Sequence, residues 1–148
     1  VVFEVSPDGK HGKIVSLEET IKQWAIKAVY RDKTGATSMT DGKANMKAIQ
    51  SIWRWRKKYP AFAWCADLGE GWYLPARDEL FAIYKAKGII NATLSSNGCT
   101  KLNLIVRYWS SSEDGTREFC AWTFYMGNGN TLADNKGGSI YVRAVSAF

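Results

Sequence analysis

The stretch "YWSSSEDGTREFCAWTFYMGNGNTLADNKGGSIYVRAV", residues 108–145, carries the aromatic side chains of a core among many small and polar residues. The apolar runs Ala121–Met126, within this stretch, and Ile140–Ala147, which continues two residues past it, are typical of strands. The Gly, Asn, Asp, Ser and Thr between them follow no regular period. Such a composition fits either loosely ordered loops or a rigid frame whose surface residues are free to differ.

Alternation within "AWTFYM" favours the rigid frame. Trp122, Phe124 and Met126 fall on one face of an extended strand, as a packed face requires. Thr123 and Tyr125 then point the other way. We therefore expect a fixed frame with exposed, substitutable residues.

The remaining chain predicts strands, then helices, then the strands above, which is the order of an α+β fold. Val1–Val5 and Lys13–Leu17 read as a hairpin, whose turn contains the Asp8-Gly9 pair that favours positive φ. Glu18–Tyr30 fits either a helical stripe or a strand. Arg31–Thr40 is polar and reads as a loop.

Helices are expected in the middle of the chain. Thr40 or Asp41 can cap the first, whose apolar contacts would be Met46, Ile49, Ile52, Trp53 and Trp55. Three further segments complete the expectation: a helix over Ala61–Leu68 that stops at Gly69, a helix from Pro75 to Gly88, and a loop over Asn91–Lys101. Leu102–Ser110 reads as a strand.

Length and charge set broad limits. The 148 residues suit one domain over 1–148, and the 7 Trp, 7 Tyr and 6 Phe supply both core and binding anchors. The formal charge of +6 supports solubility without establishing nucleic-acid binding, and we expect no nucleic-acid partner. The chain opens directly on the strand-like "VVFEV", with no signal peptide and no apolar run that could insert into a membrane. We expect a domain cut from a longer protein.

Candidate catalytic groups are few. His11, the single histidine, sits in the predicted turn and reads as a solvated residue, because acid–base work needs a positioned partner. The hydroxyls of Ser110–Ser112 read as partners of backbone groups, since no G-x-S-x-G surrounds them. Cys65 is expected to be a buried apolar residue. A disulfide between Cys99 and Cys120 is possible, but their spacing alone does not support it. We expect no catalytic residue, metal site or cofactor.

"WRWRKKY", residues 53–59, mixes cations with aromatics as single-stranded nucleic-acid binders do. A solvated helix face with inward-packed tryptophans is the favoured interpretation, because long basic side chains commonly cover apolar surface.

Several motifs together resemble a C-type-lectin-like domain found at the C-termini of bacterial surface proteins. They occur in order across nearly the whole chain: "GKHGKIVSLEE", "TDGKANM", "WCADLGEGWYLPARDEL", "NATLSSNG", "YWSSSE" and "YVRAVSAF". The family is similar in fold to formylglycine-generating enzymes and to retroelement-diversified variable proteins such as the phage tropism determinant. The resemblance implies two main helices packed on twisted antiparallel sheets, with the first and last strands adjacent.

The resemblance also implies a variable binding segment near the end of the chain, about residues 113–141. In diversified members, adenine-directed mutagenesis of AAY codons there cannot yield Glu, Lys, Gln, Met or Trp. From Asp114 to Tyr141, only four residues fall outside the reachable set: Glu118, Trp122, Met126 and Lys136. Loops are ordinarily rich in the same small polar residues, so ordinary loop composition remains the alternative.

We expect this segment to bind a protein or glycan at a bacterial cell surface or on a phage particle, without catalysis. Arg117, Phe119 and Tyr125 are the expected anchors, because Arg and aromatics dominate hot spots. The full candidate set is Asp114, Thr116, Arg117, Phe119, Thr123, Tyr125, Asn128, Asn130, Leu132, Asp134 and Asn135. Alternatives are an oxidase of the formylglycine-generating type and a structural cap of a surface assembly. The Glu-Pro-Asn, Gln-Pro-Asp and Trp-Asn-Asp triplets of calcium-dependent lectins are missing, so calcium-independent binding is expected.

Overall fold

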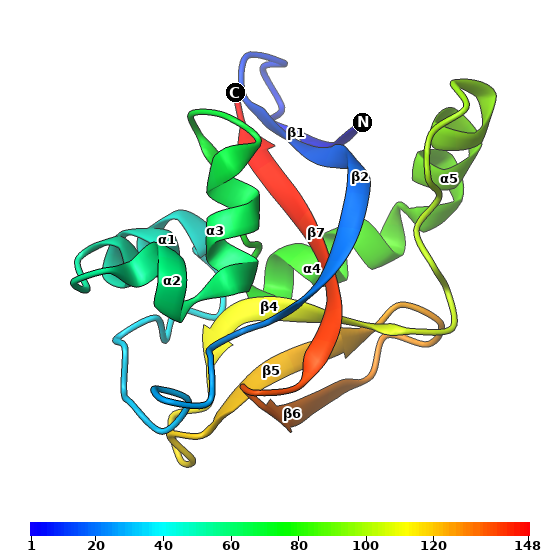
Figure 1. The fold of residues 1–148 in the computed structure, drawn as a ribbon. Helices are drawn as coiled ribbons and strands as arrows, with labels where there is room; N and C mark the ends of the chain where they lie inside the picture. The colour runs from blue at the N-terminus through cyan, green and yellow to red at the C-terminus, as the bar shows by residue number, and fades with distance from the viewer.

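Seven strands form one twisted, mostly antiparallel sheet in the computed structural model, which describes residues 1–148 (Figure 1). The strand order is β1-β2-β7-β4-β5-β6, and β3 pairs with β7 beside this path. The strands are β1 (Val2–Val5), β2 (Gly12–Gln23), β3 (Trp72–Tyr73), β4 (Arg107–Glu113), β5 (Cys120–Tyr125), β6 (Thr131–Asn135) and β7 (Ser139–Ala147).

Five helices fill the middle of the chain: α1 (Gly42–Gln50), α2 (Trp55–Lys58), α3 (Pro60–Asp67), α4 (Arg77–Lys85) and α5 (Lys87–Ser96). Helices α1 to α3 lie together on one side, α4 runs behind the strands, and α5 projects from the opposite side (Figure 1). The α+β prediction and the C-type-lectin-like architecture are confirmed. The structure has five helices in all, three more than the two main helices that the resemblance specified.

The two ends of the chain meet in a long ribbon. Strand β2 pairs antiparallel with β7 from Lys13 opposite Ala147 to Gln23 opposite Ser139. Beyond it, the backbones of Gly12 and Phe148 exchange two hydrogen bonds of 2.9 Å. The predicted hairpin is present. Its second strand, β2, lies beside the last strand, β7, while the first strand, β1, lies on the outer side of β2. The helical alternative for Glu18–Tyr30 is wrong, because pairing with β7 holds this backbone extended as far as Gln23.

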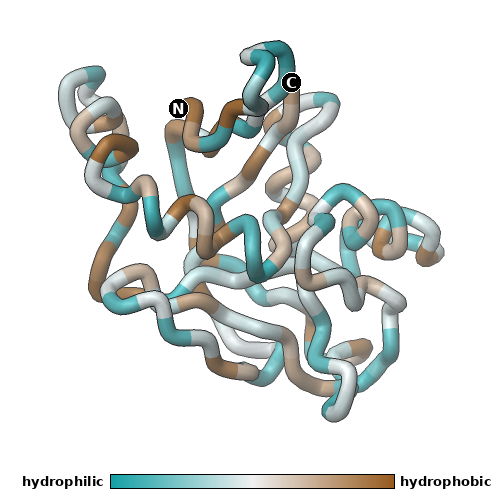
Figure 2. The backbone as a smooth tube through the Cα atoms, turned by 180° about the vertical axis from the view of Figure 1, so that it is seen from behind, coloured by the Kyte–Doolittle hydropathy of each residue, from teal (hydrophilic) through white to brown (hydrophobic).

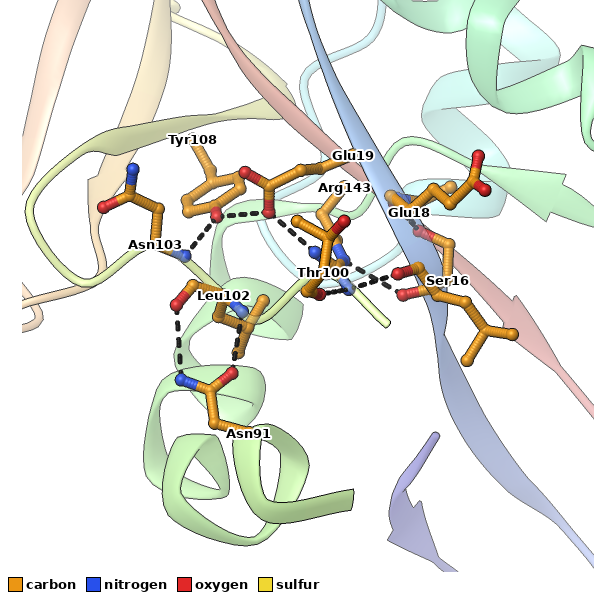
Figure 3. A network of polar contacts seen from close by, with 11 residues as sticks. Ser16, Glu18, Glu19, Asn91, Thr100, Leu102, Asn103, Tyr108 and Arg143 are labelled. Atoms are coloured by element: carbon orange, nitrogen blue, oxygen red, sulfur yellow. Dashed lines mark hydrogen bonds and ion pairs between the residues drawn. The ribbon is translucent and has the colours of Figure 1, made fainter. Parts of the chain in front are cut away.

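A bulge interrupts the ribbon between Val15 and Glu19, and Arg143 of β7 fills it (Figure 3). The Arg143 guanidinium donates to the backbone oxygens of Ser16, Leu17 and Thr100 at 2.7–2.9 Å. It also donates to the Glu19 carboxylate at 2.6 Å. Buried polar groups are costly unless hydrogen-bonded, and this arginine satisfies the carbonyls that the bulge releases.

The helix boundaries differ from the sequence prediction at two places. Asp41 caps α1 as expected, and its side chain accepts a hydrogen bond from the Ala44 N–H at 3.0 Å. However, α4 begins two residues after Pro75, and Gly88 lies inside α5, over a region predicted to be largely loop. Ile90 and Leu94 bury one side of α5, so packing stabilises a helix that local composition did not indicate.

Trp53 is the clearest failure of the helical periodicity. The chain leaves α1 before it, Arg54 adopts a left-handed φ of 56°, and the Trp53 side chain is 72% exposed. Arg54 lies over the indole at 4.2 Å, while Trp55 is half-buried. The prediction that these tryptophans pack inward is therefore wrong for Trp53.

One apolar core joins the helices to the sheet. Trp24 at the end of the ribbon is fully buried, with Tyr59 and Phe62 edge-on to its ring at 5.8 and 4.9 Å. Glu79 of α4 ties the "GWYLPARDEL" segment together, because its carboxylate accepts hydrogen bonds from the N–H of Gly42 and of Ala76 and from the Tyr73 hydroxyl.

The molecule still exposes apolar residues away from this core. Ile89 on α5 and Ile105 before β4 are 73% and 80% exposed, and hydrophobic colour is visible on the projecting α5 (Figure 2). None of the helices combines the length and the apolar character that a membrane span requires.

Candidate ligand-binding surface

The expected binding segment forms the β5–β6 hairpin, and β6 is the outermost strand of its side of the sheet. The two strands pair from Cys120 opposite Asn135 to Phe124 opposite Thr131. Strand β4 supports the hairpin from the other side, with Arg107 opposite Tyr125. The segment is thus a rigid sheet edge.

The face of the hairpin that carries Phe124 packs against α4. The Phe124 ring lies 6.2 Å from the Phe81 ring and 5.7 Å from the Tyr84 ring. Phe124 and Met126 are buried and Trp122 is half-buried. The predicted packed face of "AWTFYM" is therefore confirmed.

Lys136, directly after β6, is also part of the frame. Its ammonium group is fully buried, pairs with the Glu113 carboxylate, and lies 4.7 Å from the centre of the Trp24 ring. It donates to the backbone oxygen of Asp32 at 3.1 Å, and Glu113 accepts from the Thr34 N–H. Burial lowers the pKa of Lys136, although the contact with Glu113 opposes this effect. The pair anchors the 31–40 loop to the sheet.

Asp114 belongs to the frame as well, which corrects its expected exposure. Its carboxylate accepts hydrogen bonds from the N–H and hydroxyl of Thr116 at 2.9 Å and from Arg117 Nε at 3.1 Å. Burial alone would raise the pKa of the Asp114 carboxyl, but these hydrogen bonds hold it below its ordinary value. Asp114 is buried because it closes the β4–β5 turn.

Thr123 is the second correction. It is fully buried, although strand alternation was expected to expose it together with Tyr125. Its hydroxyl donates at 2.7 Å to Asp134 Oδ2 and also lies 3.0 Å from the Leu132 backbone oxygen. The alternation of faces is correct, but neighbouring residues cover this part of the outer face, and Thr123 orients Asp134.

Beside Asp134, an open depression of about 390 Å³ lies at one end of β6. Leu132 is 47% exposed there and Tyr125 is half-buried. Arg107 Nε lies 3.2 Å from Asp134 Oδ2, and the two side chains are 43% and 21% exposed. The lining residues are Arg107, Tyr125, Asn130, Thr131 and Leu132. We call this the Tyr125 depression.

A second open depression, of about 270 Å³, lies at the other end of β6, lined by Gln23, Lys27, Tyr30, Asn135 and Gly137. Arg31 follows the lining residue Tyr30 in the chain. Its guanidinium lies over the Tyr30 ring at 5.2 Å and over the Phe119 ring at 5.4 Å. We call this the Tyr30 depression. It joins the turn after β2 to the end of the hairpin.

The surface therefore contains residues from three parts of the chain. Nine predicted residues are exposed or half-buried on or beside the hairpin: Thr116, Arg117, Phe119, Tyr125, Asn128, Asn130, Leu132, Asp134 and Asn135. The sequence prediction missed Arg107, Thr131 and the residues of segment 23–31 that line the Tyr30 depression or lie beside it. Thr131 lies within the predicted segment between two selected residues. Arg107 and the turn after β2 lie outside that segment, and only strand pairing brings them to it.

The serines, the histidine and the cysteines considered as catalytic groups were also located in the structure. Ser110 and Ser112 are buried and donate to the backbone oxygens of Trp122 and Ser38 at 2.7 and 2.8 Å, as predicted. His11 is exposed in the β1–β2 turn. Cys65, Cys99 and Cys120 are all free, so the Cys99–Cys120 bridge is not formed. No three or more His, Cys, Asp or Glu side chains gather closely enough to hold a metal ion.

Sequence comparison places the chain in a family. The model of the Lcl C-terminal domain matches residues 15–146. The chain belongs to the Lcl C-terminal domain family. This confirms the resemblance to a C-type-lectin-like domain of bacterial surface proteins.

A solved structure supports the fold of this Lcl C-terminal domain. A fimbrial protein from Bacteroides ovatus matches with a TM-score of 0.71 and 16% sequence identity over 93% of the chain. The chain spans 36% of that protein. No curated protein matches the sequence.

Proposed function

We propose that this surface-protein domain is a non-enzymatic binding domain that holds a protein or glycan on the outer surface of the β5–β6 hairpin. The observation that carries the proposal is the division within this hairpin. Buried residues fix its backbone, while nine polar, apolar and aromatic residues are exposed or half-buried, four of which line two depressions. Binding commonly resides on variable residues held by a rigid scaffold.

The types of exposed residue support recognition. Tyr125 and Phe119 offer contact area at a low entropic cost, because an aromatic ring has few rotatable bonds. Asn128, Asn130 and Asn135 can adapt their hydrogen bonds to the ligand. We propose that binding proceeds without calcium, since the triplets of calcium-dependent lectins are missing from the sequence.

We further propose that the segment is diversified by a retroelement. Of the four residues that AAY mutagenesis cannot produce, Met126 and Lys136 are buried, Trp122 is half-buried on the packed face, and only Glu118 is exposed. Fixed codons at frame positions and permissive codons at displayed positions would preserve folding while the surface changes. A reverse transcriptase gene near this one, with an adenine-rich copy of the segment, would support the proposal. A genome with neither would contradict it.

The location proposed is the bacterial cell surface or a phage particle. The solved structure that shares the fold is that of a fimbrial protein, and this chain corresponds to only part of its length. The domain would then be carried outward by the remainder of a longer protein.

A binding screen tests the proposed function. The isolated domain is applied to protein and glycan arrays, and each ligand found is tested against the double variant Arg117→Ala/Tyr125→Ala. We expect at least a tenfold loss of affinity, because Arg and Tyr are typical binding hot spots. The control is Lys101→Ala, an exposed lysine before β4, which should bind like the parent. Unchanged binding by the double variant would refute the proposed surface.

A further inference from the structure

We propose that the Tyr125 depression binds one uncharged sugar ring of a glycan without calcium, through the Arg107–Asp134 pair and the Tyr125 ring. This inference rests on the proposed function and specifies its ligand at one subsite. It is drawn from the hydrogen-bonding groups, the charge balance and the rigidity of the depression.

The depression offers donors and acceptors that the protein itself leaves unused. Arg107 makes one ion-pair contact through Nε, so its terminal N–H groups have no partner in the protein. Asp134 Oδ2 receives Arg107 and Thr123, while Oδ1 has no donor. The side-chain amide of Asn130 and the hydroxyls of Thr131 and Tyr125 also have no hydrogen bond within the protein. Sugar hydroxyls both donate and accept, and therefore match this mixture.

The one charged residue that lines the depression is neutralised by a neighbour. Arg107 is that residue, and its Nε lies 3.2 Å from the carboxylate of Asp134, which lies next to the lining residues. An anionic group placed on Arg107 would meet the Asp134 charge, and like charges in one site disfavour each other. The Tyr30 depression differs, because Lys27 lines it and forms no ion pair. The balanced depression is therefore suited to a neutral ligand.

The aromatic wall of the site is held in place. A methyl group added at Gly127 would lie 2.8–2.9 Å from the Tyr125 ring and 2.5 Å from the Leu104 backbone oxygen. Because residue 127 has no side chain, the tyrosine packs directly against the backbone. The ring and the exposed Leu132 give the apolar part of a site that is otherwise lined by the polar residues Arg107, Asn130 and Thr131. A ring with an apolar face and a hydroxylated edge fits this arrangement.

Glycan binding under varied salt tests the inference. The domain is screened against glycans ending in neutral, sialylated and sulfated sugars, and affinities are measured at about 50 and about 500 mM salt, with and without EDTA. We expect neutral termini to bind with less than about a twofold change in affinity between these conditions, because uncharged contacts are little screened. Preference for charged termini, loss of binding at high salt, or loss with EDTA would overturn the inference.

Matched variants locate the subsite. Tyr125→Ala should weaken binding of the neutral glycan at least tenfold, and Tyr125→Phe by about threefold, since the ring remains. Asp134→Asn keeps the shape but leaves Arg107 uncompensated, so neutral glycans should bind less tightly and sialylated ones more tightly. Lys101→Ala, at an exposed lysine that lines neither depression, is the control and should change the affinity by less than about twofold. Circular dichroism and melting temperature establish that each variant folds.

The outcomes separate this inference from the proposed function. A protein or charged-glycan ligand that depends on Arg117 and Tyr125 would leave the proposed function standing and overturn the sugar subsite. Neutral-glycan binding that is insensitive to Tyr125→Ala and Asp134→Asn would also overturn the subsite. A domain that binds no array ligand would count against both.

Discussion

Two arginine–carboxylate pairs in this domain have the same chemistry and opposite surroundings. Arg143–Glu19, in the β2–β7 ribbon, is 1% and 9% exposed and has further bonds to three backbone oxygens. Arg107–Asp134, at the sheet edge, is 43% and 21% exposed and retains unused donors and acceptors. Every nitrogen of the Arg143 guanidinium donates within the protein, whereas the second pair has groups that a ligand could bind.

The contrast shows how function can be separated from stability within one sheet. A buried charge is costly unless every partner is present, so changes at Arg143 should act on folding. An exposed pair contributes little to stability because water screens it and can replace either partner. Residues of the second kind can change without unfolding the protein.

The largest effect is expected for Arg143→Leu. The change would leave Glu19 without its cation and three backbone oxygens without their donor, so we expect a loss of about 3–5 kcal/mol in the free energy of unfolding. Urea denaturation followed by tryptophan fluorescence measures it. Arg143→Lys should recover only part of the loss, since one ammonium group cannot reproduce the spread of a guanidinium. A loss below about 1 kcal/mol for Arg143→Leu would show that the Arg143–Glu19 pair contributes no more to stability than an exposed ion pair, which would contradict the contrast between the two pairs.

Lys136→Met should rank next, with a loss of about 3 kcal/mol, because Glu113 would keep its charge in a buried site without its cation. The double variant Glu113→Gln/Lys136→Met removes both charges and should be more stable than Lys136→Met alone. Equal stabilities for these two variants would contradict the claim that an unpaired Glu113 carboxylate destabilises the fold, and Glu113→Gln alone completes the cycle that measures the coupling. Thermal and urea unfolding provide the comparison.

Asp114 is a third buried charge, and its contribution to stability should depend on pH. Its folded-state pKa is lowered, so its contribution to stability is fully present above the ordinary carboxyl pKa and is lost as the pH falls through the folded-state value. Asp114→Asn should therefore cost about 1–2 kcal/mol at neutral pH and progressively less in acid. Urea unfolding of both proteins from neutral pH down to about pH 3 measures the difference. A constant difference across this range would contradict the assignment.

The smallest stability change is expected for Arg107→Ala, below about 1 kcal/mol, because its ion pair is exposed. The same variant should reduce ligand affinity if the Tyr125 depression is a binding site. Melting temperature and titration calorimetry on one sample measure both quantities. A large destabilisation without a change in affinity would reverse the roles assigned to the two arginines.

The sequence predicted the frame better than the surface. Strand periodicity identified the packed face of "AWTFYM" and the last strand, because period-two alternation is a local signal. Thr123 and Asp114 were placed at the surface because local pattern does not report which outer faces neighbouring segments cover. Arg107 and the turn after β2 were missed because they reach the hairpin only through pairing between distant strands.

The helical region shows the same limit. The Asp41 cap is a local signal and was correctly predicted. Helix α5 is stabilised by the burial of Ile90 and Leu94, and the local sequence pattern does not predict that these two residues are buried. Trp53 was misplaced because α1 already ends at Gln50, although nothing in the sequence marks a break there, and the left-handed Arg54 then starts a separate short helix.

The central position of β7 has a consequence for biosynthesis. This strand pairs with β2, β3 and β4, so the strand that follows all the others along this domain supplies the middle of the sheet. The sheet cannot close while residues 139–147 are still inside the ribosome, and closure then joins segments from opposite ends of the chain. Such long-range pairing is slow to form. The β1–β2 and β4–β5–β6 parts of the sheet therefore stay unconnected until residues 139–147 have left the ribosome.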